Sequence, residues 1–324
     1  MKGLQVDVNV LREFEQGLDP QHPERSTVPA RILGYGEIST VFEIQMEGLR
    51  HLAFKRLPIF STQREMDSYQ SAYEGYCRLL QEEVGLRLPA YGYAAFVTDA
   101  GRPRFYIIQQ QLPHASIGNR ALHLLSREDA LALVRRILQE LRKVWEFNHR
   151  QLGSQVAIDG QLSNWSIDGF NAQDPRLPEN AVLQYMDTST PLYRIQGKEQ
   201  IDPEWFLRSG PSFLMWMLRL LFLKDVVDRY YDFHRVALDL VANFYKEQRP
   251  DLVPDLVGVV NGFFAGEVAH LQVQPITEQE VKSYYREDAL IWTLYLAMRK
   301  VDRFLRSRVL HREYPYILPA QIKR

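Results

Sequence analysis

The sequence has little cysteine and almost no net charge, and each shortage narrows the classes of protein that it can represent. Cys77 is the single cysteine among 324 residues, which excludes an internal disulfide and any metal site built from several cysteines. The 39 basic and 40 acidic residues nearly balance. This balance argues against a surface devoted to nucleic acid, so no nucleic-acid partner is expected.

Long hydrophobic runs are lacking as well. The most apolar stretch, residues 213–223 (FLMWMLRLLFL), is too short to span a bilayer and carries Arg219 near its middle. It predicts a buried helix, with a membrane-surface anchor as the alternative. Charges interrupt the apolar runs of the N-terminus, so neither a signal peptide nor a transmembrane segment is expected. Together with the lone cysteine, these features predict a cytoplasmic protein.

Several short catalytic signatures are also missing. The sequence contains no Walker A motif, no His-Glu-x-x-His, no Gly-x-Ser-x-Gly and no paired Cys/His spacing. The motifs that mark P-loop, zinc-protease and α/β-hydrolase sites are therefore absent.

The amino-acid composition and its periodicity change along the chain, and this change predicts an α+β fold. Residues 1–27 are polar and predict an N-terminal arm or short helix. Residues 28–112 are rich in branched and aromatic residues, and strands are predicted at 28–36, 39–46, 49–57, 91–99 and 104–112. Residues 113–324 are mainly helical. The clearest helix there spans residues 127–151, with Ser126 as its N-cap.

One prominent helix interrupts the strand-rich part, at residues 62–85. Thr62 is its expected N-cap and Gly85 its stop signal. Its apolar and aromatic residues recur at helical spacing and fall on one face: Met66, Tyr69, Tyr73, Tyr76, Leu79 and Leu80.

Two features of the strand-rich part suggest phosphate chemistry. Gly34-x-Gly36-x-x-Ser39 lies between two predicted strands, where glycines let the backbone approach phosphates closely; an ordinary hairpin turn is the alternative. Lys55 lies on the following strand and needs a partner if it faces inward, because a buried unpaired ammonium is costly. Glu74 in the middle of the helix is the expected partner, with Glu65 as a competitor.

Two further features follow the long helix. The stretch VAIDGQLSNWSI, residues 156–167, places Asp159 five residues before Asn164, and Asp187 ends the apolar strand AVLQYM. An aspartate directly after a buried strand is a common position for a metal ligand, and it is equally common as a turn residue.

In this order, a Gly-rich hairpin, a strand lysine, a helix glutamate, Asp-x-x-x-x-Asn and an Asp after a strand form the parts of a phosphotransferase. The sequence therefore resembles the protein-kinase-like superfamily, in particular its small-molecule kinase branch of aminoglycoside phosphotransferase and choline kinase types. The motifs that carry the resemblance span residues 28–190.

The resemblance implies a two-lobed fold, with a small antiparallel-sheet N-lobe carrying one helix at residues 28–112 and a larger, mainly helical C-lobe at residues 113–324. It also implies ATP/Mg²⁺-dependent phosphorylation of a small hydroxyl- or amine-bearing molecule. The site residues that it implies are Gly34, Gly36 and Ser39 over the nucleotide phosphates, Lys55 against the phosphates and paired with Glu74, Gln111 and Leu112 beside adenine, Asp159 as base, and Asn164 and Asp187 as Mg²⁺ ligands.

The sequence also departs from the superfamily's pattern. Ser39 replaces the third glycine, and Ala157 stands where a histidine usually precedes the base by two residues. The interval between Asn164 and Asp187 is long, so Asp168 or Asp174 is the alternative metal ligand. These departures leave open a non-catalytic kinase-like (pseudokinase) protein that binds a nucleotide or another ligand, and a nucleotidyl transferase on the same scaffold.

Overall fold

The structure is a computed structural model, and it describes residues 3–19, 22–36, 39–207, 227–311 and 314–318. The apolar run at 213–223, for which a buried helix is predicted, lies outside the described residues. Along the described chain, no helix combines the length and apolar character needed to cross a bilayer.

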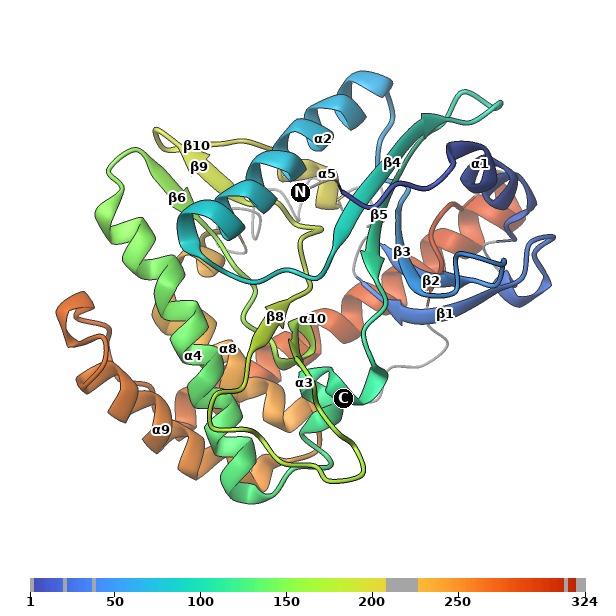
Figure 1. The fold of residues 1–324 in the computed structure, drawn as a ribbon. Helices are drawn as coiled ribbons and strands as arrows, with labels where there is room; N and C mark the ends of the chain where they lie inside the picture. Colours follow the sequence, from blue (N-terminus) through green and yellow to red (C-terminus); the bar gives the residue numbers. More distant parts are fainter. Residues whose placement is uncertain (1–2, 20–21, 37–38, 208–226, 312–313, 319–324) are drawn as a thin grey trace.

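The first part of the chain forms the five-stranded antiparallel sheet that the sequence predicts. Its strand order is β1-β2-β3-β5-β4 (Figure 1). The strands are β1 (Ala30–Tyr35), β2 (Thr40–Ile44), β3 (Leu52–Leu57), β4 (Tyr91–Val97) and β5 (Pro103–Gln110). Side chains alternate between the two faces, so each strand contributes one set of residues to each face.

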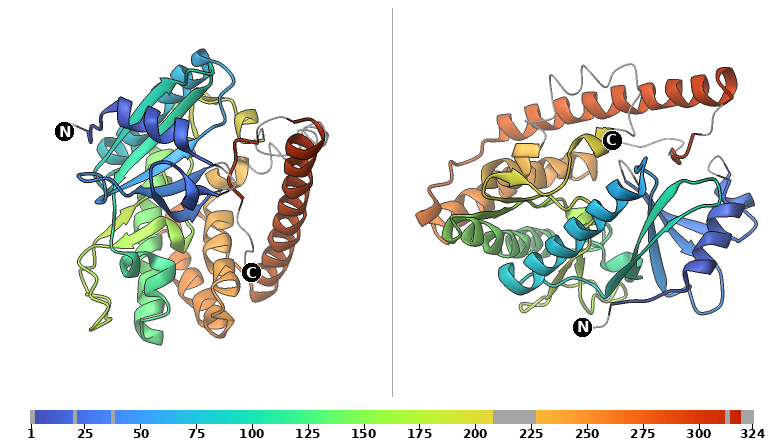
Figure 2. Two further views of the ribbon diagram at one scale, coloured as in Figure 1. Left: turned by 90° about the vertical axis from the view of Figure 1, so that its right-hand side faces the viewer. Right: turned by 90° about the horizontal axis from the view of Figure 1, so that it is seen from above.

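The centre of the outer face of this sheet is buried because α1 (Val8–Gly17) packs on it (Figure 2). Leu11 and Phe14 of α1 meet Phe42 and Phe54 of the sheet, and all four are 0% exposed. The segment predicted as an arm is thus part of the N-lobe core.

The helix α2 (Gln63–Arg78), with a π-helical extension Leu79–Val84, is the predicted one. Thr62 caps it by accepting a hydrogen bond from the N–H of Glu65 at 3.3 Å. Gly85 ends it in the left-handed region at φ 80°, where a residue without a Cβ is favoured. The helix runs between the five-stranded sheet and a small sheet of the C-lobe (Figure 1).

The second part is mainly helical, which confirms the predicted α+β architecture. Among the described residues its helices are α3 (Gly118–Ala121), α4 (Arg127–Arg150), α5 (Glu204–Leu207), α8 (Phe233–Lys246), α9 (Val253–Ala265) and α10 (Glu278–Phe304). Its short strands are β6 (Ser154–Val156), β7 (Trp165–Ile167), β8 (Leu183–Tyr185), β9 (Tyr193–Ile195) and β10 (Lys198–Glu199), in the sheets β10-β9-β6 and β7-β8. Ser126 caps α4 through the N–H of Asp129, as predicted.

The two parts are joined by one continuous core. Leu57, Phe105 and Ile107 of the sheet belong to the same buried cluster as the inward residues of α2, α4 and α8. This shared core fixes the sheet relative to the helices, so side chains from both parts can meet at a defined distance.

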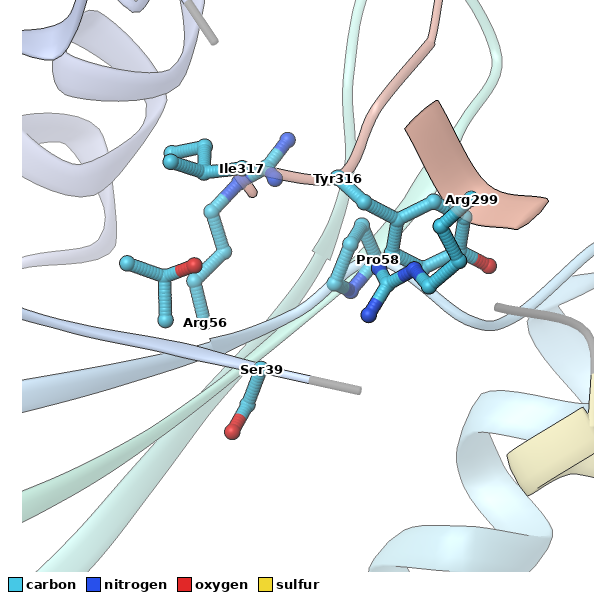
Figure 3. A pocket seen from close by; sticks show the side chains of 7 residues that line it. Ser39, Arg56, Pro58, Arg299, Tyr316 and Ile317 are labelled. Atoms are coloured by element: carbon cyan, nitrogen blue, oxygen red, sulfur yellow. The ribbon is translucent and has the colours of Figure 1, made fainter. Parts of the chain in front are cut away.

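The end of the described chain returns to the N-lobe. The helix α10 runs along one side of the molecule (Figure 2), and residues 314–318 then lie between the sheet, which Ile317 contacts, and α10, whose Arg299 donates to the hydroxyl of Tyr314 at 3.3 Å. Arg56 donates Nη1 to the carbonyl oxygen of Pro315 at 2.7 Å, and Ile317 joins the core under α1. Figure 3 shows Tyr316 and Ile317 beside Arg56 and Arg299 around a cavity of about 10 Å³, which is room for one water molecule.

Candidate functional site

Lys55 lies on the inner face of the sheet. Lys55 pairs with Val41 on β2 and with Ile107 on β5, so the three share one face of the sheet. Ala53 lies two residues earlier on the same face. Val41, Ala53 and Lys55 are half-buried, whereas Phe42 and Phe54 on the outer face are fully buried. The inner face therefore keeps access to a ligand at this end of the sheet.

Lys55 and Asp187 form an ion pair between the two parts of the molecule. Lys55 Nζ lies 2.7 Å from Asp187 Oδ1 and 2.7 Å from the Oγ of Ser189. Ser189 also donates its hydroxyl and its N–H to Asp187 Oδ1, at 2.8 and 3.2 Å. Burial raises the pKa of the Asp187 carboxyl, but the charge of Lys55 and these hydrogen bonds outweigh burial and hold the pKa below its usual value.

The loop from Asp159 to Asn164 lies directly beside the Asp187 segment. Asn164 donates its side-chain Nδ2 to the main-chain carbonyl oxygen of Asp159 at 3.2 Å. The main-chain carbonyl of Asn164 accepts the N–H of Met186 at 2.8 Å. The N–H of Gln161 donates to Asp159 Oδ1 at 3.1 Å. Four of the predicted site residues (Lys55, Asp159, Asn164 and Asp187) are thus brought together.

Asp159 has the electrostatics of a base that works near neutral pH. Burial is the largest cause that raises its pKa, followed by the negative charges of Asp239 and Asp187, and the pKa reaches about 7. A carboxyl at this value is divided between its two protonation states at neutral pH. It can therefore accept a proton and later release it.

Asp239, a residue that the sequence analysis missed, lies on α8 close to this carboxyl. Burial raises its pKa, while Arg229 and Lys246 oppose the shift. Lys246 donates Nζ to the side chain of Gln161 at 3.4 Å, so α8 also contacts the Asp159 loop. No signal in the sequence could have found Asp239, because it is one of many helix carboxylates and only the fold brings it to Asp159.

The prediction that Glu74 is the partner of Lys55 is wrong. Glu74 is exposed and accepts hydrogen bonds from Tyr93 and, at 3.3 Å, from Gln70. The competitor Glu65 accepts the N–H of Ser61 at 2.8 Å. The physical reason is helix rotation, because each residue turns by about 100° and Tyr73, next to Glu74, already lies on the buried face.

The inner face of α2 carries tyrosines in place of a carboxylate. Tyr69, Tyr73 and Tyr76 are buried, and the hydroxyls of Tyr69 and Tyr76 reach the site segments. Tyr69 donates its hydroxyl to the carbonyl oxygen of Ser189 at 2.8 Å. Tyr76 donates its hydroxyl to the carbonyl oxygen of Ala157 at 2.8 Å.

The Gly-rich segment covers the end of β1, which contains Gly34, and the start of β2, which Ser39 precedes. The N–H of Gly36 donates to the carbonyl of Ser39 at 3.0 Å, and a Cβ at Gly36 would lie 2.5 Å from the Ser39 Oγ. A Cβ at Gly34 would meet nothing within 4 Å. The Ser39 side chain is buried and points away from Tyr316 and Arg299 (Figure 3). A side chain at Gly36 would therefore have to displace Ser39 Oγ, while Gly34 borders open space.

The predicted adenine contacts, Gln111 and Leu112, follow directly after β5. The N–H of Gln111 donates to the carbonyl of His51 at 2.8 Å, and its side chain donates to Glu43 at 3.2 Å. The Gln111 N–H is therefore committed to the sheet. Of the two predicted adenine contacts, Leu112 and the carbonyl of Gln111 are the parts that remain for a ligand.

The metal alternatives lie away from Lys55. Asp168 is exposed, and Asp174 pairs with Arg176 at 3.1 Å on the surface. Asp187 contacts Lys55, so the arrangement favours Asp187 over both. No group of three His, Cys, Asp or Glu side chains suited to a metal occurs among the described residues.

Asn164 and Asp187 nevertheless suit a magnesium ion that arrives with a nucleotide. The Nδ2 of Asn164 and the Oδ1 of Asp187 are committed to hydrogen bonds, which leaves one side-chain oxygen of each residue. Magnesium is typically held by one or two protein oxygens together with phosphates and water. The pair thus fits such an ion, and it is too small a donor set for a structural metal.

The fold and site define a two-lobed α+β protein with a lysine–aspartate pair between its lobes and a carboxyl of raised pKa beside it. The chain belongs to the family described as "Family of unknown function (DUF6206)", whose profile matches residues 20–303. No curated protein matches the sequence.

Three solved structures show how distant the similar proteins are. Each is 12% identical to this chain. WaaP in complex with acyl carrier protein covers 63% of this chain and 90% of its own, with a TM-score of 0.30. For the GDP complex of aminoglycoside 2'-phosphotransferase-IIIa, the match covers 81% of this chain and 100% of that protein's chain, with a TM-score of 0.26. For amicoumacin kinase hAmiN in complex with AMP-PNP, Ca²⁺ and Ami, the match covers 92% of this chain and 93% of that protein's chain, with a TM-score of 0.27. At these values the likeness carries no functional weight.

Proposed function

We propose that the protein is an ATP- and Mg²⁺-dependent phosphotransferase that acts on a small hydroxyl- or amine-bearing molecule. The observation that carries the proposal is the meeting of the Lys55–Asp187 ion pair, at 2.7 Å, with Asp159, whose pKa is raised to about 7. Such a site offers a cation for phosphate oxygens and a base for the acceptor.

Each residue has a definite task in this proposal. Asp159 accepts the proton of the acceptor hydroxyl or amine while that oxygen or nitrogen bonds to the γ-phosphorus and the bond to the bridging oxygen breaks. Lys55 binds phosphate oxygens, and the open space beside Gly34 lets the backbone approach them. Asn164 and Asp187 would hold Mg²⁺, which neutralises charge on the phosphates when it is bound.

The rest of the nucleotide would lie against the inner face of the sheet. Val41 and Ala53 are half-buried there and offer apolar contact to a base. Leu112 follows at the end of β5. The acceptor would lie on the other side of Asp159, toward α8 and Asp239.

A thermal-shift experiment tests the proposal. ATP and Mg²⁺ together should raise the melting temperature more than either alone, because a nucleotide with its ion binds only the folded protein. Asp187→Ala should abolish the extra shift, whereas the exposed Asp168→Ala should keep it. If ATP and Mg²⁺ give no shift in any combination, the nucleotide proposal is wrong. Transfer that survives Asp159→Asn would remove Asp159 as the base.

A non-catalytic nucleotide-binding protein is the second candidate. The position of Glu74, exposed and away from Lys55, favours it, because an active kinase-like site normally pairs the lysine with a glutamate of the N-lobe helix, whereas Lys55 pairs with Asp187. Nucleotide binding that is unaffected by Mg²⁺ and by Asp187→Ala, without turnover, would decide for this candidate.

A further inference from the structure

Two tyrosines of α2 reach from the N-lobe to both segments that carry the proposed chemistry. Tyr69 bonds the carbonyl of Ser189, two residues after Asp187. Tyr76 bonds the carbonyl of Ala157, two residues before Asp159. We propose that Tyr69 and Tyr76 are positioning residues that set the metal-ligand segment and the base loop from one helix. This inference rests on the proposed function and deepens it.

The contacts of Tyr69 form an unbroken chain to Lys55. Its hydroxyl lies 2.8 Å from the carbonyl oxygen of Ser189. The hydroxyl of Ser189 lies 2.7 Å from Lys55 Nζ and 2.8 Å from Asp187 Oδ1. A glutamate on α2 would contact the lysine directly. Here the helix acts on Lys55 through the backbone and side chain of Ser189.

Tyr76 holds the base loop in a comparable way. Its hydroxyl lies 2.8 Å from the carbonyl of Ala157, whose N–H donates to the carbonyl of Leu192 at 3.0 Å. Both polar backbone groups of Ala157 are therefore bonded within the protein. The ring of Tyr76 stacks on Tyr193 with 6.4 Å between ring centroids, which fixes the direction of the hydroxyl.

Burial and chemistry suit both tyrosines to this task. Tyr69 is 0% and Tyr76 1% exposed, so water does not compete for either hydrogen bond. Burial, together with the charge of Asp187, raises the pKa of both phenols well above the usual value. Each phenol therefore remains a neutral donor at neutral pH.

The two hydroxyls should produce two different defects when they are removed. Tyr69→Phe keeps the ring and frees the Asp187 segment, so the metal requirement should change. Tyr76→Phe frees the Asp159 loop, so the proton transfer should change while the metal requirement is kept. If the tyrosines had a purely structural role, each variant would impair Mg²⁺ binding and proton transfer together, or would impair neither.

The matched control is Tyr93→Phe. Tyr93 also donates its hydroxyl to α2, but to Glu74 on the exposed side of the helix. The control therefore removes a hydroxyl that bonds the same helix without contact to either site segment. Melting temperatures of all variants establish that each is folded at the assay temperature.

Two measurements test the proposal. The first is the Mg²⁺ concentration that half-saturates binding of a fluorescent ATP analogue, and the second is the pH profile of ATP turnover. Tyr69→Phe should raise the half-saturating Mg²⁺ concentration by about 10–100-fold, a usual cost of losing a residue that orients a metal ligand. Tyr76→Phe should leave that concentration unchanged, lower the maximal turnover and shift the ascending limb of the pH profile.

A second pair of variants tests the link through Ser189. Ser189→Ala should reproduce the Mg²⁺ defect of Tyr69→Phe, and Ser189→Thr, which keeps the hydroxyl, should restore binding. If Tyr69→Phe and Tyr76→Phe both behave like Tyr93→Phe, the positioning role is overturned while the proposed function stands. If the wild-type protein binds no Mg²⁺–nucleotide, the proposed function fails, and the inference fails with it.

Discussion

Glu15 is a buried carboxylate whose loss should destabilise the N-lobe strongly. It lies on α1 and accepts hydrogen bonds from Arg56 at 2.7 and 2.6 Å, from Arg104 and from Tyr106. The side chains of Glu15, Arg56 and Arg104 are only 5%, 3% and 5% exposed. Because Arg56 also holds the carbonyl of Pro315, this cluster joins α1, the sheet and the C-terminal segment.

The size of the effect follows from the pKa of Glu15. Burial alone would raise it, but Arg56, Arg104 and Tyr106 lower it from 4.5 to about 2. A shift of roughly 2.5 pKa units corresponds to about 3 kcal/mol of stability at neutral pH. Removing one member of a buried ion pair costs a similar amount, about 3–5 kcal/mol. Glu15→Gln, which keeps the shape, should therefore lower the free energy of unfolding by about 3 kcal/mol at pH 7.

The pH dependence has a definite sign. Since the folded-state pKa is depressed, the contribution of Glu15 is fully present above 4.5 and is lost as the pH falls through about 2. The difference between wild type and Glu15→Gln should therefore shrink to about half at pH 3. Urea unfolding at pH 7 and pH 3, followed by tryptophan fluorescence, measures both values. The exposed Glu13→Gln on the same helix is the control.

A surface substitution changes the free energy of unfolding by about 0.5 kcal/mol or less. If the free energies of unfolding of Glu15→Gln and of the Glu13→Gln control at pH 7 differ by no more than about this amount, the assigned role of Glu15 is refuted. A difference that grows as the pH falls would also refute it, because a depressed carboxyl pKa cannot produce that sign.

Three further predictions concern the site and the helices. ATP turnover should rise with pH through an apparent pKa of about 7, and Asp159→Asn should remove this limb; a flat profile in the wild type would contradict the assignment of Asp159. Gly36→Ala should force Ser39 Oγ out of its position, because the new Cβ would lie 2.5 Å from it, and titration with a fluorescent ATP analogue should show severalfold weaker binding than with the wild type. Ser126→Ala should cost about 1 kcal/mol in urea unfolding through loss of the α4 cap, and an unchanged midpoint would contradict that role.

The sequence predicts the architecture because its signals are local. The strands β1 to β5 are rich in branched and aromatic residues, and α2 and α4 begin after Thr62 and Ser126, residues that cap helices by themselves. The Asp159–Asn164 loop and Asp187 are likewise set by the elements that precede them. A local pattern is enough wherever the structural cause lies within a few residues.

The Lys55 partner could not be predicted from distance along the chain. Glu74 is well placed in the sequence, but the periodicity of Met66, Tyr69, Tyr73 and Tyr76 already defines the buried face of α2, and Glu74 lies outside it. The helical spacing alone therefore indicates that Glu74 does not face Lys55. What it did not contain is the path from Tyr69 through Ser189 to Lys55, because that path exists only after β8 and its following turn are packed under α2.

Ala157 shows how a missing motif residue can be replaced from a distant part of the chain. The resemblance to kinases leads one to expect a histidine two residues before the base, whose side chain would steady the loop. In this protein the position is 1% exposed, and both backbone groups of Ala157 are bonded, one to Leu192 and one to Tyr76. The support for Asp159 thus comes from a tyrosine 81 positions earlier in the chain. An alanine suffices there because α2 supplies the hydrogen bond that a local side chain would otherwise make.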